Sequence, residues 1–207
     1  MKFSSASLVV SAATVVVLGV PTPAPAPPGI PSASTARTLL AGLEIATPLS
    51  GGGYSRHLFP TWETIQGNCN AREFVLKRDG KDVQTNSACV AQSGTWISPY
   101  DGVSFTNASR LDIDHMVPLK NAWISGASQW TTDERKRLAN DITRPQLWAV
   151  SAHANRGKSD GSPDEWKPPL KTFWCTYAKS WVQVKSHYEL TITDAEKGSL
   201  AGMLDSC

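Results

Sequence analysis

A strand-like segment and a later asparagine carry the residue types that a metal-dependent hydrolase needs. Residues 111–119 read Leu-Asp-Ile-Asp-His-Met-Val-Pro-Leu, and Asn155 opens the later stretch Asn-Arg-Gly-Lys-Ser-Asp. A magnesium-type ion prefers oxygen ligands and keeps several waters, so one carboxylate and one amide can hold it. A neighbouring imidazole can deprotonate an attacking water, because its ordinary pKa lies near neutral pH. Asp114, His115 and Asn155 therefore predict a hydrolytic metal site.

Three short elements would have to position these side chains. Apolar and polar residues alternate over 111–115, which indicates a half-buried strand, and Pro118 stops it. Residues 147–150 are short and apolar and predict a second strand. A helix over 152–158 should follow and bring Asn155 back across the strand end that carries Asp114.

These segments together resemble the HNH (ββα-metal) nuclease motif. The HNH domain of the RNA-guided CRISPR effector carries an almost identical Asp-x-Asp-His-x-Val-Pro followed by Asn-Arg-Gly-Lys-Ser-Asp. From about Tyr54 onward the chain also resembles a family of small secreted HNH-type proteins from fungi and actinobacteria. The domain of that family recurs at the C-terminal end of some modification-dependent restriction endonucleases.

The resemblance implies a role for each motif residue. Asp114 and Asn155 are expected to ligate one divalent ion, Mg²⁺ or Mn²⁺, and His115 is expected to act as the general base. Asp112 is expected either to orient the strand end or to lie behind the metal ligands. Arg156 and Lys158 are expected to contact substrate phosphate, and the competing interpretation is a solvated helix end.

The sequence departs from the usual HNH pattern at one position. In many HNH domains a middle asparagine precedes the second strand and braces the loop. That position falls near Gln146 here, and Asn140 lies further back. Either residue could brace the loop.

Composition limits the size and the partners of the protein. The chain has 207 residues, 41% of them apolar, and a net charge of +2, so we expect one domain with a real core and no large basic face. Nucleic-acid contacts must then come from a local cluster of basic residues. No module for reading base sequence is appended, so little sequence selectivity is expected.

The N-terminus reads as a targeting segment. Lys2 precedes an apolar run over 8–20 that is too short for a membrane span and has the length of a signal-peptide core. Residues 21–36 are rich in Pro, Ala and Ser and are expected to be disordered or removed. We therefore predict a signal peptide at 1–20, a single nuclease domain at 37–207, secretion, and a mature form without a membrane anchor.

The cysteines fit an exported protein. Their even number and the absence of Cys-x-x-Cys favour disulfides over a zinc ribbon, and three pairings are possible. Pairing near neighbours, Cys69 with Cys89 and Cys175 with Cys207, is favoured because it leaves the motif segments unbridged. Asn107-Ala108-Ser109 is a glycosylation sequon, meaningful only in a eukaryotic secretory pathway.

Local patterns predict the remaining elements of an α+β fold: a ββα-metal core with added β-hairpins and C-terminal helices, stapled by disulfides. Capping boxes predict a helix over 132–139 and a further helical turn from Ser162, and Thr193 should cap the last helix. The other predicted elements are helices over 37–46 and 172–188, a hairpin of strands 73–78 and 81–85 turned by Asp79-Gly80, and a hairpin of strands 95–98 and 103–105.

These observations predict a secreted endonuclease that hydrolyses phosphodiester bonds, mainly in DNA, with RNA also open. The main alternative is a secreted binding or effector protein that keeps the nuclease fold with weak or no catalysis. A structural zinc site that uses His115 is a second alternative, but too few soft ligands lie near it in the sequence. The oligomeric state is left open.

Overall fold

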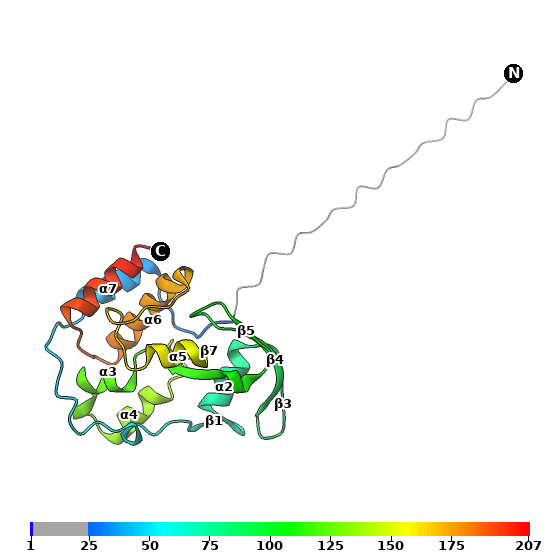
Figure 1. The fold of residues 1–207 in the computed structure, drawn as a ribbon, viewed down its shortest axis with the longest axis horizontal. Helices are drawn as coiled ribbons and strands as arrows, with labels where there is room; N and C mark the ends of the chain where they lie inside the picture. The colour runs from blue at the N-terminus through cyan, green and yellow to red at the C-terminus, as the bar shows by residue number, and fades with distance from the viewer. Residues whose placement is uncertain (2–24) are drawn as a thin grey trace.

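The computed structural model describes residue 1 and residues 25–207, so the apolar run of the predicted signal peptide lies outside the described residues. Helices α1 (Ala33–Gly42), α6 (Trp174–His187) and α7 (Asp194–Leu204) gather at one end of the fold. Helix α2 (Ala71–Asp79) and the small sheets occupy the other end (Figure 1). Within the described part, the helices are too short or too polar to cross a membrane.

A two-stranded antiparallel sheet lies between these two ends. Strand β6 (Leu111–His115) pairs along its whole length with β7 (Leu147–Ser151), so that Asp114 lies opposite Trp148. Helix α5 (Ala152–Lys158) begins directly after β7, and the Ser151 hydroxyl caps it by accepting from the Ala154 amide. The two predicted strands and the predicted helix are confirmed, and β7 is one residue longer than expected.

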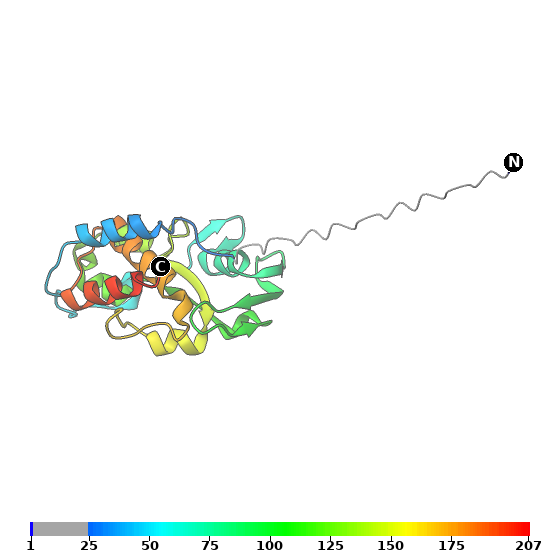
Figure 2. The ribbon, with the colours of Figure 1, turned by 90° about the horizontal axis from the view of Figure 1, so that it is seen from above.

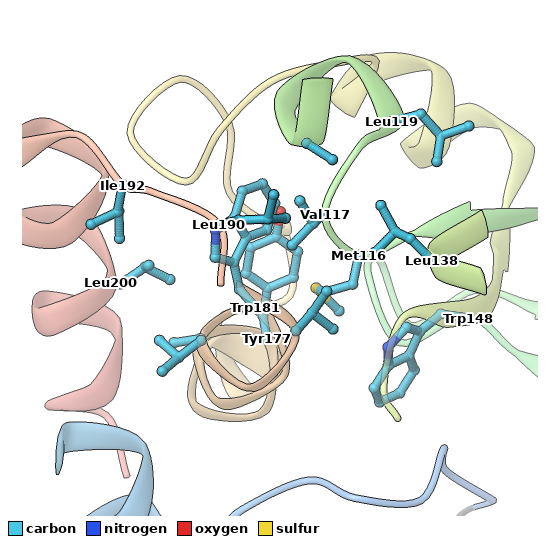
Figure 3. Close-up of a cluster of buried hydrophobic side chains, with 14 of the residues drawn as sticks. Met116, Val117, Leu119, Leu138, Trp148, Tyr177, Trp181, Leu190, Ile192 and Leu200 are labelled. Atoms are coloured by element: carbon cyan, nitrogen blue, oxygen red, sulfur yellow. The ribbon is translucent and has the colours of Figure 1, made fainter. Parts of the chain in front are cut away.

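The larger hydrophobic core lies among the helices. Tyr177 and Trp181 of α6 pack with Met116 and Val117, which follow β6, and all four are fully buried (Figure 3). The helical spacing of apolar residues in 172–188 predicted this face of α6. A disulfide between Cys175 and Cys207 ties α6 to the chain end after α7, as expected. The packing of the helices thus supports the end of β6 from behind.

One predicted strand is a helix. Residues 73–78 belong to α2, whose first turn is capped by the Asn70 side chain accepting from the Glu73 amide. Val75 and Leu76 of α2 are buried against Trp96 and the β6–β7 pair. Asp79-Gly80 consequently ends a helix and does not turn a hairpin. Gly80 also lies so close to the Trp96 indole that a Cβ would collide with it.

A three-stranded antiparallel sheet follows α2. Strand β3 (Lys81–Thr85) pairs with β4 (Ala91–Ile97), which pairs with β5 (Ser104–Phe105). The predicted β4–β5 hairpin is therefore confirmed. Strands β1 (Thr64–Gln66) and β2 (Cys69–Asn70) form a separate pair. The predicted Cys69–Cys89 disulfide is present and ties β2 to the loop between β3 and β4.

The remaining elements show one confirmation and three corrections. Helix α4 (Thr132–Ala139) has the predicted bounds and capping box, and α3 (Leu119–Ile124) follows Pro118. Helix α1 begins four residues before the predicted helix and ends at Gly42. Because Ser32 caps α1 and Ala36 is buried, the expectation that 21–36 lies outside the fold is wrong at its C-terminal end. Residues 163–165 form a turn and not the expected helical turn.

Four 3₁₀ helices complete the described part: η1 (Arg56–Leu58), η2 (Ala108–Arg110), η3 (Ala127–Gln129) and η4 (Lys171–Phe173).

The two projections agree on the arrangement around the central pair. Helix α5 lies beside β6 and β7 in both views (Figure 1, Figure 2). The chain end after α7 lies next to the α1 and α6 region. Strands β6 and β7 therefore lie in the middle of the fold, and α5 lies at its surface.

Candidate active site

The motif residues meet in one pocket. Asp114 and His115 at the end of β6 line a cavity of about 320 Å³ together with Asn155 of α5. Most of the other lining residues are sequence neighbours of Asp114, His115 or Asn155, and Arg56 comes from an earlier segment. They are Arg56, Ile113, Pro118, Leu119, Arg156, Ser159 and Asp160. The antiparallel register and the helix directly after β7 bring the two sequence segments together.

His115 is held in one tautomer by the backbone. Its Nε2 lies 2.9 Å from the carbonyl oxygen of Ala139, at the end of α4. A carbonyl oxygen can only accept, so Nε2 carries the proton, and a neutral ring then has its lone pair on Nδ1. Burial lowers the pKa of His115 to about 3; the Ala139 contact opposes this, and the charges of Arg56 and Lys158 add to it. The neutral imidazole is thus a proton acceptor at Nδ1.

The His115 ring also packs against an aromatic side chain. Trp62 stacks on it with ring centroids 5.9 Å apart and an interplanar angle of 29°. Trp62 has a positive φ of 61°, a conformation that bulky residues rarely adopt. Its placement therefore depends on the contacts of the surrounding segment.

Asp114 is fixed by two buried groups. Lys158 Nζ donates to Oδ1 at 2.9 Å and to Oδ2 at 2.7 Å, and the Tyr100 hydroxyl donates to Oδ2. Lys158 also donates to the His115 carbonyl at 2.8 Å, and its side chain is fully buried. The expectation that Lys158 contacts substrate phosphate is therefore wrong, because its ammonium is enclosed in the core with Asp114.

Asp114 and Lys158 stabilise each other's charged form, which burial disfavours. Burial raises the pKa of the Asp114 carboxyl, while Lys158 acts to lower it. Burial lowers the pKa of Lys158, while Asp114 acts to raise it. Each charged group thus depends on the other for its stability in the core.

Asn155 is oriented by the first aspartate of the motif. Its Nδ2 donates to Asp112 Oδ2 at 3.2 Å, which leaves the amide Oδ1 outside that hydrogen bond. Asp112 thus holds the side chain that carries the predicted ligand atom. Arg156 Nε lies 3.9 Å from the same Asp112 oxygen, and its side chain is 79% exposed. The Arg156 guanidinium is thus exposed beside Asp112, whereas the Lys158 ammonium is buried.

The donor set fits a small hard cation. Asp114 and Asn155 line the pocket, whereas Lys158 and Tyr100 do not, so these two groups reach Asp114 from the core side. Asp114 Oδ1 accepts one hydrogen bond, and a carboxylate oxygen can accept two. One carboxylate oxygen and one amide oxygen, with space for water, match the chemistry of Mg²⁺ or Mn²⁺ sites.

Both candidate bracing residues make buried contacts. Gln146 Oε1 accepts from the Val117 amide and its Nε2 donates to the Val117 carbonyl, each at 3.0 Å. Asn140 donates to the Pro60 carbonyl at 2.8 Å and accepts from the Glu63 amide at 2.9 Å. Gln146 therefore fixes the turn after His115, and Asn140 fixes the segment that carries Trp62.

Motif reasoning missed three residues of the site: Arg56, Trp62 and Tyr100. Each reaches the site through tertiary packing, and no local pattern marks it.

Asn107, in the sequon, is exposed, and its side chain accepts from the Ser109 amide at 2.9 Å.

Comparison with known proteins places the chain. Residues 68–203 match the family described as GmrSD restriction endonucleases, C-terminal domain. An "Uncharacterized secreted protein" of Arthroderma benhamiae (strain ATCC MYA-4681 / CBS 112371) is 54% identical over 193 residues, which is 93% of this chain and 95% of that protein. No solved structure matches. The secreted relative and the two disulfides confirm the prediction of secretion. The chain belongs to the family of the C-terminal domain of GmrSD restriction endonucleases.

Proposed function

We propose that this protein is a secreted, metal-dependent endonuclease that hydrolyses phosphodiester bonds of DNA, with RNA as a further substrate to be tested. One observation carries the proposal. Asp114, His115 and Asn155 come from two distant segments and line one pocket, and the contact with Ala139 leaves Nδ1 of His115 as a base. Membership in a nuclease-related family supports the same class of activity.

The elements that carry these residues are proposed to be a ββα-metal core. The pair β6–β7 is antiparallel, α5 follows β7 directly, and the motif residues sit at the end of β6 and on α5. This order and the residue types are those expected from the resemblance to HNH nucleases. The proposal therefore joins the chain's topology to its side-chain chemistry.

His115 is the residue that moves a proton in this proposal. Nδ1 accepts a proton from the attacking water, while Nε2 remains bonded to the Ala139 carbonyl. A substrate phosphate in the pocket adds negative charge near the ring and acts to raise the low pKa of His115, whereas a bound divalent ion acts to lower it. Trp62 and the Ala139 carbonyl keep the ring in place during this step.

Asp114 and Asn155 would hold the divalent ion. When bound, Mg²⁺ or Mn²⁺ supplies positive charge that stabilises the phosphorane-like transition state and the departing 3′ oxygen. Lys158 and Tyr100 keep the Asp114 carboxylate in one orientation, and Asp112 does the same for the Asn155 amide. Arg156, exposed beside the pocket, would bind a phosphate of the substrate.

The test is cleavage of plasmid DNA and of RNA by the purified secreted protein with Mg²⁺, Mn²⁺ or a chelator. His115→Ala should abolish cleavage. His153→Ala is the matched control, because His153 is an exposed histidine of α5 outside the pocket lining, and it should keep the wild-type rate. Cleavage by the His115→Ala protein would refute the mechanism. Absence of cleavage by the wild type with every metal would favour a binding or effector protein on this fold.

A further inference from the structure

The 54–63 segment precedes the family-matched residues and lies against the pocket. The family match begins at residue 68, whereas Arg56 of this segment lines the same pocket as Asp114, His115 and Asn155. Trp62, near the end of the segment, stacks on His115. The site thus includes two residues, Arg56 and Trp62, that lie outside the matched span 68–203.

Aromatic packing anchors the segment on both sides of Arg56. Tyr54 and Phe59 pack against Trp123 of α3, with ring centroids 6.1 Å and 6.4 Å apart. Phe59 is almost fully buried. The segment is therefore attached to the core by side chains placed two residues before and three residues after Arg56.

Hydrogen bonds fix the backbone between these anchors and β1. Arg135 of α4 donates from Nε to the Leu58 carbonyl at 2.9 Å. Asn140 holds the Pro60 carbonyl and the Glu63 amide, as described above. The residues around Arg56 thus occupy defined positions, which is the condition for a side chain to contribute to a binding site.

The guanidinium of Arg56 is available for an external anion. Its side chain is exposed, and within residues 25–207 it forms no ion pair and no side-chain hydrogen bond. The two acidic residues that line the pocket already have cationic partners, Asp114 in Lys158 and Asp160 in Lys120. An arginine beside the proposed base, and without an acidic partner, is suited to a phosphate.

We infer that Arg56 is a substrate-binding residue that contacts a backbone phosphate of a nucleic acid, and that it acts together with Arg156 on α5. The inference rests on the proposed function, because it takes a nucleic acid as the ligand. The 54–63 segment then forms a second wall of the substrate site, one that the motif does not contain. Arg156 contributes the other charge from the helix that follows β7.

The experiment measures binding separately from cleavage. Binding of a fluorescent single-stranded DNA oligonucleotide is followed by anisotropy in the presence of a chelator over a series of salt concentrations. The proteins are the wild type, Arg56→Ala, Arg56→Lys and Arg137→Ala. Arg137 is the matched control, because it is an exposed arginine of α4 that does not line the pocket.

Each variant has a stated expectation. For a single strand, the logarithm of the association constant falls as the logarithm of the salt concentration rises, and each phosphate contact contributes about 0.7 to the steepness of that fall. Arg56→Ala should therefore give a slope that is less steep by about 0.7. Arg56→Lys should keep the wild-type slope with weaker binding, because the charge remains but the planar fork is lost. Arg137→Ala should match the wild type. The Tm of Arg56→Ala should equal that of the wild type, because the Arg56 side chain is exposed.

The outcomes separate this inference from the proposed function. An unchanged slope in Arg56→Ala, or a wild type that does not bind the oligonucleotide, would overturn the inference. If His115→Ala abolishes cleavage while the Arg56→Ala slope is unchanged, the nuclease stands and Arg56 is not a phosphate ligand. If no protein cleaves but Arg56→Ala shows the reduced slope, the phosphate contact stands and the proposed catalysis fails.

Discussion

Replacing Lys158 by methionine should destabilise the protein strongly. The Lys158 ammonium donates to both oxygens of Asp114 and to the His115 carbonyl, and the side chain is fully buried. Methionine fills a similar volume but leaves the Asp114 carboxylate in the core without its counter-charge. Breaking a buried ion pair from one side costs about 3–5 kcal/mol of unfolding free energy. In a chain of this size that corresponds to a fall in Tm of roughly 6–20 °C.

The control is a lysine that pairs with an aspartate at the rim of the same pocket. Lys120 Nζ lies 3.9 Å from Asp160, and both side chains are 49% exposed. Exposed pairs contribute about 0–1 kcal/mol, so Lys120→Met should change the free energy of unfolding by no more than that. Urea unfolding of both variants in chelator measures the difference.

A double variant tests whether the cost arises at Asp114. Lys158→Met combined with Asp114→Asn removes the unpaired charge, so the double variant should recover part of the stability lost in Lys158→Met. A loss below about 1 kcal/mol in Lys158→Met, or one no larger than in Lys120→Met, would refute the assignment of a buried ion pair at this site.

Two further predictions concern the helical end of the fold. Lys185→Met should lower the unfolding free energy by about 3–5 kcal/mol, because Lys185 is the buried partner of Glu196 at 3.1 Å; a loss under about 1 kcal/mol in urea unfolding would contradict this. Replacing Cys175 and Cys207 by serine should cost about 2–5 kcal/mol, because the bridge between them closes a loop across α6 and α7. An unchanged urea midpoint in that double variant would show that the bridge does not stabilise the fold.

The parts of the fold that local chemistry determines could be predicted from the sequence. The capping box of Thr131 and Glu134 set the start of α4, and the apolar spacing in 172–188 identified the buried face of α6. Strand β6 was predictable because apolar and polar residues alternate over 111–115 and Pro118 follows shortly after them. Each of these signals lies within a few residues of the element that it specifies.

Residues 73–78 show where such reasoning fails. A run of six residues is too short for its hydrophobic pattern to separate a strand from a helix, and the side chains of Phe74, Val75 and Leu76 suit either. The helix is determined by the Asn70 cap and by burial of Val75 and Leu76 against strands that follow later in the chain. Tertiary packing therefore decided the structure of this segment.

The candidate site shows the same division. Asp114, His115 and Asn155 were found from residue type and spacing. The inward orientation of Lys158 could also have been inferred, because residues three apart on a helix share a face and Asn155 faces the strands. Arg156 directly follows Asn155, lies on a different face of the helix and is exposed. Arg56, Trp62 and Tyr100 enter the site from other segments, and no pattern in those segments marks them.

The central claim is that Asp114 and Asn155 hold a divalent ion while His115 activates the water, so ion binding and catalysis should separate by mutation. The most direct measurement is calorimetric titration of Mn²⁺ into the wild type, His115→Ala and Asp114→Ala, beside plasmid cleavage by the same preparations. We predict that His115→Ala binds Mn²⁺ like the wild type but cleaves at least about 100-fold more slowly, and that Asp114→Ala loses both. Wild-type cleavage by His115→Ala, or wild-type Mn²⁺ binding by Asp114→Ala, would contradict the account.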